Sequence, residues 1–258
     1  MNSQDYVNEL FNLEGHVGIV TGASRGLGMG IAQVLTNAGA TVYNLDIIGR
    51  SDEKEITGNM IDIHADLTDR EAVREIVDRI AADEGHLDFL INNAMLTRGG
   101  LPNCSYEDFN YVLRVGVAAP YMLTRLFQEH FGENGSVVNI SSSRDRMSQP
   151  GTESYTAAKG GIHALTHAMA VSLAGRVRVN SISPGWIDTD FKEYQGPDAL
   201  QQPAGRVGNP LDIANMVLFL CSPRAGFING ENICIDGGMT RQMIYHGDFG
   251  WKLEADQG

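Results

Sequence analysis

The sequence predicts an α/β protein with one doubly wound parallel sheet of about seven strands and helices on both faces. Three observations predict this fold class. Short runs of β-branched residues alternate with longer helical patterns along the whole chain. Several of these short runs are apolar almost throughout, as expected for parallel strands that are covered on both faces. Neither a linker nor an internal repeat interrupts this order, so we expect residues 1–258 to form a single domain.

The predicted strands run from "HVGIVT" near the start of the chain to "ENICID" near its end. They lie at 16–21, 41–46, 60–65, 87–92, 136–141, 176–183 and 231–236. The predicted helices between them lie at 26–38, 69–84, 105–131, 153–174 and 210–221. The pattern is clearest at 69–84, where apolar residues recur at helical spacing and Thr68 or Asp69 can cap the N-terminus.

Two further segments do not follow the alternation. Residues 184–209 are irregular and rich in Gly, Pro and Gln, and a loop of this length predicts a substrate loop. The C-terminal tail, 239–258, is too apolar for a free tail, so we expect it to pack at a subunit interface or beside a substrate cleft. Its apolar residues are Met243, Ile244, Tyr245, Phe249 and Trp251.

Composition excludes several classes of function. The formal net charge of −13 argues against a nucleic-acid partner, because the sequence has no basic stripe to neutralise phosphates. No apolar run is long enough to span a bilayer and the N-terminus lacks a signal-peptide pattern, so we expect a cytoplasmic protein without a membrane partner. The three cysteines are widely separated and predict reduced thiols. His163 and His167 lack further metal ligands, so we expect no metal site and assign them to a packed or interface helix face.

The stretch "VTGASRGLGMG" at 20–30 follows the first predicted strand and opens the first helix. Gly22, Gly26 and Gly28 let the backbone turn sharply, and a helix N-terminus behind such a turn suits a pyrophosphate. The same letters also fit the nucleophile elbow of a serine hydrolase, centred on Ser24. An elbow needs an oxyanion loop from an earlier strand, and only 21 residues precede this turn. The sequence therefore favours a dinucleotide site over a hydrolase.

The end of the second predicted strand supports the dinucleotide interpretation. Asp46 lies 24 positions after Gly22, where an acidic residue accepts hydrogen bonds from ribose hydroxyls. A carboxylate there would repel the 2′-phosphate of NADP, whereas Arg25 would attract it. Because the carboxylate occupies the place of the extra phosphate, we expect NAD as cofactor and NADP as the less favoured alternative.

Together with "SYTAAKG" at 154–160, these motifs make the chain resemble the short-chain dehydrogenase/reductase family over roughly residues 13–240. The motifs that carry the resemblance are "TGASRGLG" (21–28), "DL" (66–67), "NNA" (92–94), "NISS" (139–142), "YTAAK" (155–159), "SPGWIDT" (183–189), "GRVGNPLDIA" (205–214) and "NGENICIDGG" (229–238). The resemblance implies a Rossmann-like fold, a homotetramer, and hydride transfer between NAD(H) and a secondary alcohol or its ketone.

The resemblance also implies roles for single residues. Tyr155 would be the acid in reduction and the base in alcohol oxidation. Free tyrosine has a pKa of about 10, and Lys159, one helical turn away, is expected to lower it and to hold the nicotinamide ribose. Ser142 would orient the substrate oxygen. The expected cofactor-binding residues are Gly22, Ser24, Arg25, Gly26, Leu27, Gly28, Asp46, Ile47, Asp66, Leu67, Asn93, Ala94, Met95, Ile140, Tyr155, Lys159, Pro184, Gly185, Ile187 and Thr189.

Two positions depart from the family pattern. The family usually has an asparagine where this chain has Gly116, and most often a glycine where it has Met95. A water or a main-chain carbonyl at Gly116 could complete the proton relay. The alternative is a dinucleotide-binding protein with weak or no catalysis. Met95 could lean over the cofactor or substrate, or simply fill the core.

The sequence does not identify the substrate. Arg98, Arg144 and Arg146 are expected near the mouth of the site, where they could attract an anionic substrate or face solvent.

Overall fold

The computed structural model describes residues 10–50 and 58–252, and these form one seven-stranded parallel sheet with helices on both faces. The strand order is β3-β2-β1-β4-β5-β6-β7, and every pairing is parallel. The strands are β1 (Val17–Thr21), β2 (Thr41–Asp46), β3 (Asn59–His64), β4 (Leu87–Asn92), β5 (Phe131–Ile140), β6 (Val177–Pro184) and β7 (Asn232–Ile235). The predicted fold class is confirmed.

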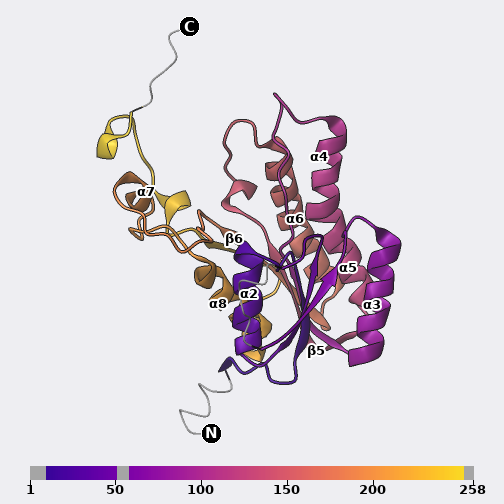
Figure 1. The fold of residues 1–258 in the computed structure, drawn as a ribbon. Helices are drawn as coiled ribbons and strands as arrows, with labels where there is room; N and C mark the ends of the chain where they lie inside the picture. Colours follow the sequence, from indigo (N-terminus) through magenta and orange to yellow (C-terminus); the bar gives the residue numbers. More distant parts are fainter. Residues whose placement is uncertain (1–9, 51–57, 253–258) are drawn as a thin grey trace, which may run out of the picture.

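The helices divide between the two faces (Figure 1). One buried cluster joins the sheet to α3 (Arg70–Glu84), α5 (Ala119–Phe127) and α6 (Glu153–Ser172). The other joins it to α2 (Gly26–Asn37) and α8 (Pro210–Cys221). The large apolar side chains of β1 and β4 are fully buried, which explains why these strands lack an alternating pattern.

The strand order reverses direction between β1 and β4. From β1 the chain first adds β2 and β3 on one side, and then crosses to β4 and the strands beyond it. In open α/β sheets, ligands bind outside the carboxyl ends of the strands at such a switch point. The motifs "TGASRGLG", "NNA" and "NISS" all follow strand ends, so the fold brings them to one edge of the sheet.

The predicted helix at 105–131 is wrong in two respects. It is interrupted, with α4 (Tyr106–Leu113) and α5 separated by a π-helical segment, η1 (Arg114–Ala118). It also ends at Phe127, because β5 begins at Phe131 and not at 136 as predicted, and pairs with Leu87. The extra residue of a π-turn commonly marks a functional site, and this one contains Gly116.

Other helix starts follow their sequence signals. The side chain of Asp69, one of the two predicted caps, accepts hydrogen bonds from the backbone of Glu71 and Ala72. Asn209 and Asp212 form a capping box at the start of α8.

The predicted substrate loop, 184–209, contains the short helix α7 (Pro197–Leu200) and is closed by a bridge between Ile187 and Gly208. The remaining elements are single 3-10 turns. They are η2 (Ser143–Asp145), η3 (Pro223–Ala225), η4 (Met239–Arg241) and η5 (Asp248–Gly250).

Beyond η4 the tail extends away from the sheet (Figure 1). The side chains of Met243, Tyr245 and Trp251 are exposed in the single chain. Their packing at a subunit interface stays a prediction, and residues 253–258 lie outside the described part of the tail.

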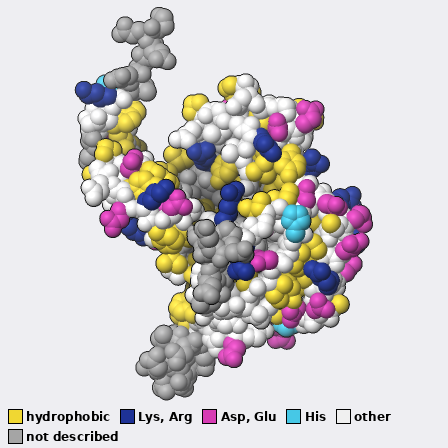
Figure 2. All heavy atoms as spheres, in the orientation of Figure 1, with side chains coloured by type: hydrophobic (Ala, Val, Ile, Leu, Met, Phe, Trp, Pro, Cys, Tyr) yellow, Lys and Arg dark blue, Asp and Glu magenta, His cyan; other side chains and the backbone are white. Residues whose placement is uncertain are grey.

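The surface in the same orientation is uneven in charge. Acidic side chains gather over the flank formed by α3, whereas several Lys and Arg side chains lie near the centre of this face (Figure 2). Among the helices in the described residues, none has the length and hydropathy needed to cross a membrane.

Candidate active site

A cleft of about 400 Å³ lies at the carboxyl ends of the first four strands, and we call it the glycine-loop cleft. It contains twelve of the predicted cofactor-binding residues. They are Gly22, Arg25, Gly26, Leu27, Gly28, Asp46, Ile47, Asp66, Leu67, Asn93, Ala94 and Met95. The structure therefore places in one cleft residues that the sequence related to each other only by their matches to separate motifs.

The glycine loop has a shape that only glycine permits. Gly22 has a φ of 68°, in the left-handed region. A Cβ at Gly28 would lie 2.3 Å from the carbonyl oxygen of Gly22, so a side chain there would push the loop and α2 apart. The first turn of α2 has no side-chain cap and no acidic residue. Its backbone N–H groups are thus left for an anionic ligand, which fits the pyrophosphate of a dinucleotide.

Asp46 is fixed at the rim of this cleft by the main chain. Its carboxylate accepts hydrogen bonds from the backbone N–H of Ser24 (3.0 Å) and of Ile48 (3.2 Å). Two carboxylate oxygens offer about four acceptor positions, so capacity is left for ribose hydroxyls. Arg25 lines the same cleft and makes no ion pair with any described residue.

Ser24 has a structural role that contradicts the nucleophile-elbow alternative. Its side chain is buried, its hydroxyl donates to the carbonyl of Ile48 (2.8 Å), and it accepts from Asn44 Nδ2 (3.0 Å). The nucleophile of an elbow must be exposed and must contact a base. Ser24 lies in the predicted loop, but its hydroxyl is used in hydrogen bonds that hold that loop in place.

Two residues that the sequence did not single out support the glycine loop. Asn44 accepts from the backbone N–H of Ala23 (2.9 Å), and Thr21 Oγ1 accepts from that of Asn93 (3.0 Å). Asn93 Nδ2 donates in turn to the carbonyls of Thr21 (2.9 Å) and Gly22 (3.0 Å). A buried asparagine inside an apolar strand was the available signal for Asn44, because buried polar groups need partners.

A second cavity, of about 590 Å³, contains Ser142 and Tyr155, and we call it the Tyr155 cavity. Its other lining residues are Ser143, Arg144, Met147, Ser148, Gln149, Gly185, Trp186, Ile187, Gln201 and Met239. These residues come from η2, the segment between η2 and α6, the 184–209 loop and the first residue of the tail. The sequence indicated these loops but not the individual residues Gln149, Gln201 and Met239.

The predicted residues at the end of β6 connect the two hollows. Pro184 is the last residue of β6, and Gly185 and Ile187 line the Tyr155 cavity. Thr189 approaches the glycine loop, since its Cγ2 lies 3.6 Å from the place that a Cβ on Gly26 would take.

Lys159 lies below Tyr155 on α6 and is buried. Its Nζ donates to the main-chain carbonyl of Ile140 (2.6 Å) and lies 5.4 Å from the centre of the Tyr155 ring. Ile140 is the last residue of β5, so this contact ties the amine to the strand end that precedes Ser142. Burial without a charged partner lowers the pKa of Lys159 to about 7.

The pKa of Tyr155 differs in direction from the sequence expectation. Burial raises it, while a hydrogen bond with Ser142 and the positive charge of Arg144 act in the opposite sense, and the net pKa lies above the usual value. Arg144, and not Lys159, is the cation whose charge acts to lower the pKa of Tyr155 against the effect of burial. Because burial favours the neutral amine of Lys159, that residue contributes less than its spacing implied.

A buried carboxylate fixes the turn that follows Ser142. Asp145 accepts hydrogen bonds from Arg146 Nε (2.8 Å), Ser183 Oγ (3.0 Å) and Asn232 Nδ2, and pairs with His163 Nδ1 (2.9 Å). Burial alone would raise the pKa of Asp145, but these contacts outweigh it and the pKa lies below its usual value. Residues from η2, α6, β6 and β7 meet at this group, which explains His163 as part of a packed helix face.

The two departures from the family pattern are neighbours in space. A Cβ at Gly116 would lie 2.8 Å from Met95 Sδ and 3.0 Å from Ala158 Cβ. Met95 thus occupies the space beside the π-helical segment that a larger residue at 116 would need. It also lines the glycine-loop cleft, and both interpretations of Met95 stay predictions.

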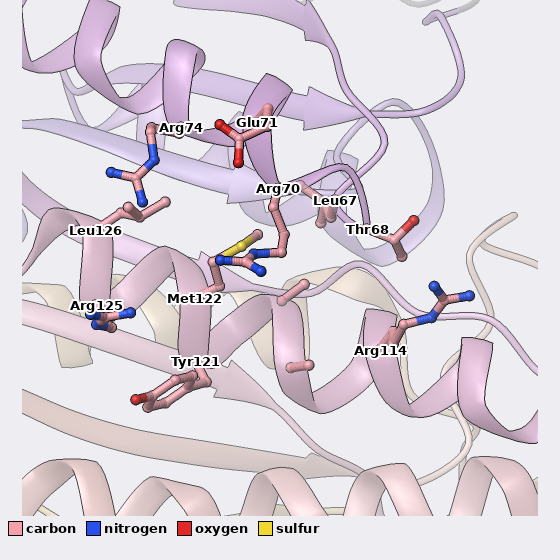
Figure 3. A pocket seen from close by; sticks show the side chains of 12 residues that line it. Leu67, Thr68, Arg70, Glu71, Arg74, Arg114, Tyr121, Met122, Arg125 and Leu126 are labelled. Atoms are coloured by element: carbon pink, nitrogen blue, oxygen red, sulfur yellow. The ribbon is translucent and has the colours of Figure 1, made fainter.

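A third hollow, the arginine groove, lies between α3 and α5 (Figure 3). It has a volume of about 280 Å³, and its arginines come from α3, η1 and α5. It shares only Leu67 with the predicted site residues and holds neither Tyr155 nor Ser142, so it is separate from the acid–base groups. In the described parts of the chain, no group of three or more His, Cys, Asp or Glu side chains is placed to hold a metal ion.

Known proteins match nearly the whole chain. A family profile described as enoyl-(acyl carrier protein) reductase matches residues 22–240. A protein named uncharacterized oxidoreductase from Thermotoga maritima is 39% identical over 253 residues, which cover 90% of this chain and 99% of that protein. The 3-oxoacyl-[acyl-carrier-protein] reductase FabG of the same organism is 33% identical, with coverage of 88% and 99%. A solved structure of an apo SCOR enzyme from Clostridium thermocellum has a TM-score of 0.86 at 41% identity, with coverage of 94% and 99%.

Proposed function

The chain belongs to the short-chain dehydrogenase/reductase family, and from that premise we propose that it transfers a hydride between NAD(H) and a secondary alcohol or the corresponding ketone. The observation that carries the proposal is the meeting of Ser142 and Tyr155 in one cavity, with Lys159 buried directly below. The nicotinamide would accept or supply the hydride when it is bound.

Tyr155 is the proposed acid and base. Its raised pKa keeps the hydroxyl protonated near neutrality, which suits proton donation to a carbonyl oxygen. In the oxidative direction the phenolate must form, and a nearby positive charge favours it. Arg144 supplies such a charge in the free protein.

Ser142 and Lys159 position the reacting groups. Ser142 Oγ already accepts from the backbone N–H of Arg144 (3.2 Å), and this leaves its hydroxyl proton for a substrate oxygen or Tyr155. Lys159 is proposed to hold the nicotinamide ribose and, once charged, to lower the pKa of Tyr155. A pKa of about 7 lets the amine take up or release a proton near neutrality, which a relay requires.

Asp46 supports NAD over NADP. Its carboxylate is held on the rim of the glycine-loop cleft by two backbone N–H groups, so it cannot easily turn away from a 2′-phosphate. The remaining predicted residues that line this cleft are proposed to bind the dinucleotide. The homotetramer and the cytoplasmic location remain proposals, and light scattering of the purified protein tests the first.

A second candidate function is NAD binding with weak catalysis. Gly116 lacks the side-chain amide that relatives of the family usually have, and Met95 fills the adjoining space. The sequence leaves sugars or polyols, hydroxysteroids and 3-oxoacyl compounds as candidate substrates, and the name of the FabG relative supports the last of these.

The first test follows the absorbance of reduced nicotinamide with a panel of secondary alcohols and ketones. NAD(H) and NADP(H) are run in parallel, beside Tyr155→Phe. We expect turnover with NAD(H) that falls about 10²–10⁴-fold in the variant, because acid–base catalysis contributes that much. Turnover that survives in Tyr155→Phe would refute the assignment. Cofactor binding without turnover across the panel would support the second candidate.

A further inference from the structure

The Tyr155 cavity contains one charged side chain, Arg144, and no acidic one among its lining residues. The chain as a whole carries a formal net charge of −13, so a cavity without a carboxylate is unusual for its surface. Polar but uncharged groups surround the arginine, from Ser148, Gln149 and Gln201. The electrostatics of this cavity therefore favour an anion.

The three arginines near the mouth differ in what they contact. Arg98 lies 3.7 Å from Asp108, and Arg146 makes two hydrogen bonds to Asp145. Arg144 has no ion pair with any described residue, and its guanidinium donates only to the neutral amide oxygen of Gln149. It is the only one of the three that lines the Tyr155 cavity.

Arg144 is also held in place without use of its charge. Its backbone N–H donates to Ser142 Oγ, and the next residue, Asp145, is anchored in the buried network. The guanidinium carbon lies 5.7 Å from the centre of the Tyr155 ring. A fixed main chain places this cation within reach of the same small molecule whose oxygen contacts Tyr155.

From these contacts we infer that Arg144 binds a carboxylate of the substrate, and that the substrates are compact α-, β- or γ-hydroxy acids and the corresponding oxo acids. The inference rests on the proposed dehydrogenase function. An arginine presents two parallel N–H groups that match the two oxygens of a carboxylate, and such charged pairs are stronger than neutral hydrogen bonds. Gln149 would be released, or would take a second oxygen of the same group.

The 5.7 Å between the guanidinium carbon of Arg144 and the centre of the Tyr155 ring also limits the size of the substrate. One molecule must place its reacting oxygen at Tyr155 and its carboxylate at Arg144. A long acyl chain with a distant anionic group would not satisfy both contacts. Chain length between the two groups is therefore part of the expected specificity.

The test compares each hydroxy acid with its own methyl ester, which differs mainly in charge. We measure kcat/KM for both with the wild type, Arg144→Met, Arg144→Lys and the matched control Arg98→Met. The wild type should prefer the acid, and Arg144→Met should lower the acid-to-ester ratio about 10- to 150-fold, the range for a hydrogen bond to a charged group. Arg144→Lys should recover part of the ratio, because it restores charge without the paired geometry. Arg98→Met should leave the ratio at the wild-type value.

The ratio separates recognition from a general effect on Tyr155. Loss of the Arg144 charge also alters the pKa of Tyr155, but that change affects acid and ester alike. An acid-to-ester ratio that is the same in wild type and Arg144→Met overturns the inference. A wild type that prefers the ester overturns it as well.

A binding measurement keeps this inference distinct from the proposed function. If no alcohol or ketone is turned over, the dehydrogenase assignment fails, but carboxylate binding is still measurable. Calorimetry with the corresponding saturated, unreactive acid should then show binding to the wild type that weakens at least tenfold in Arg144→Met. Equal binding, or none to the wild type, would overturn the inference. Unchanged thermal denaturation of the variant shows that the effect is not one of folding.

Discussion

The glycine-loop cleft and the Tyr155 cavity are built in different ways. The cleft is held by contacts with the main chain, as in the hydrogen bonds of Asp46 to Ser24 and Ile48. The cavity is bounded by side chains from distant segments, such as Arg144, Trp186 and Met239. A ligand that many proteins share can be recognised by backbone geometry, whereas a particular substrate requires particular side chains. The first kind of site leaves short motifs in a sequence, and the second does not.

The largest effect should come from the network that supports the cavity. Asp145→Ala removes a buried carboxylate that accepts from Arg146, Ser183 and Asn232, so several donors lose their partner. We expect the free energy of unfolding to fall by about 3 kcal/mol at neutral pH. Urea denaturation measures it. Asp78→Ala, which removes an exposed carboxylate on α3 that makes no ion pair with a described residue, is the control and should change stability by less than about 0.5 kcal/mol.

The pH dependence of that stabilisation has a definite sign. The pKa of Asp145 in the folded protein lies below its ordinary value of 3.8. The stabilising contribution of the Asp145 carboxylate is therefore fully present when the pH is above that ordinary pKa. It is lost as the pH falls through the pKa that Asp145 has in the folded protein. A difference between wild type and Asp145→Ala that stays constant down to the most acidic conditions would contradict the network.

The next largest effect tests the cleft. Asp46→Ser removes the carboxylate and leaves Arg25 free to meet a 2′-phosphate. We expect the ratio of kcat/KM for NADP to that for NAD to rise about 100-fold, equivalent to about 2.7 kcal/mol. Asp83→Asn makes the same change of charge on α3 and should leave the ratio as it is. A ratio unchanged in Asp46→Ser would mean that something other than this carboxylate selects the cofactor.

A smaller effect is expected beside the glycine-loop cleft, at Gly116 and Met95. Gly116→Asn should lower the free energy of unfolding by about 1–3 kcal/mol, because its Cβ collides with Met95 Sδ. In the double variant with Met95→Ala the part of this loss that comes from Met95 should disappear, while the 3.0 Å approach to Ala158 remains, and a double-mutant cycle measures the coupling. Gly160→Asn is the matched control, since a Cβ at Gly160 meets nothing within 4 Å.

The same variants also test the proton relay. If water or a main-chain carbonyl completes the relay at Gly116, the double variant should gain little in turnover. A large gain would show that the native relay is incomplete.

The smallest effect concerns Lys159. Its pKa is about 7 in the folded protein and about 10.5 when unfolded, so the unfolded chain binds more protons between these values. Stability from this group therefore rises with pH. Between pH 7.5 and 8.5 the stability of the wild type should rise relative to Lys159→Met by roughly 1 kcal/mol. Urea denaturation at both pH values measures this, and parallel pH profiles would show that the buried amine keeps its ordinary pKa.

The fold and the glycine-loop cleft could be predicted from the sequence to a large extent. The second and fourth strands begin and end where predicted, because turn residues and apolar runs define them locally. The division of the 105–131 helix could not be predicted, since no local sequence pattern marked the π-turn, and its Gly116 lies beside Met95 and Ala158, which only the fold brings there. The early start of β5 is also tertiary, because Phe131 pairs with Leu87.

Less of the Tyr155 cavity could be predicted from the sequence. The spacing of Tyr155 and Lys159 predicted their common helix face, but not that Arg144 would be the cation that lowers the pKa of Tyr155. Three arginines looked equivalent in the sequence. Only the structure separates Arg144 from Arg98 and Arg146, because ion pairing depends on residues brought together by the fold.

The contact of Met95 with Gly116 has a consequence for oxidative damage. Oxidation of a thioether to the sulfoxide adds a polar oxygen to the sulfur. Sδ lies close to η1, since a Cβ at Gly116 would be only 2.8 Å from it. Met95 also lines the glycine-loop cleft, so an oxygen on Sδ that pointed away from η1 would enter the space proposed for the dinucleotide. We expect such a lesion to weaken binding of the proposed dinucleotide, and a bound dinucleotide to shield the sulfur from attack.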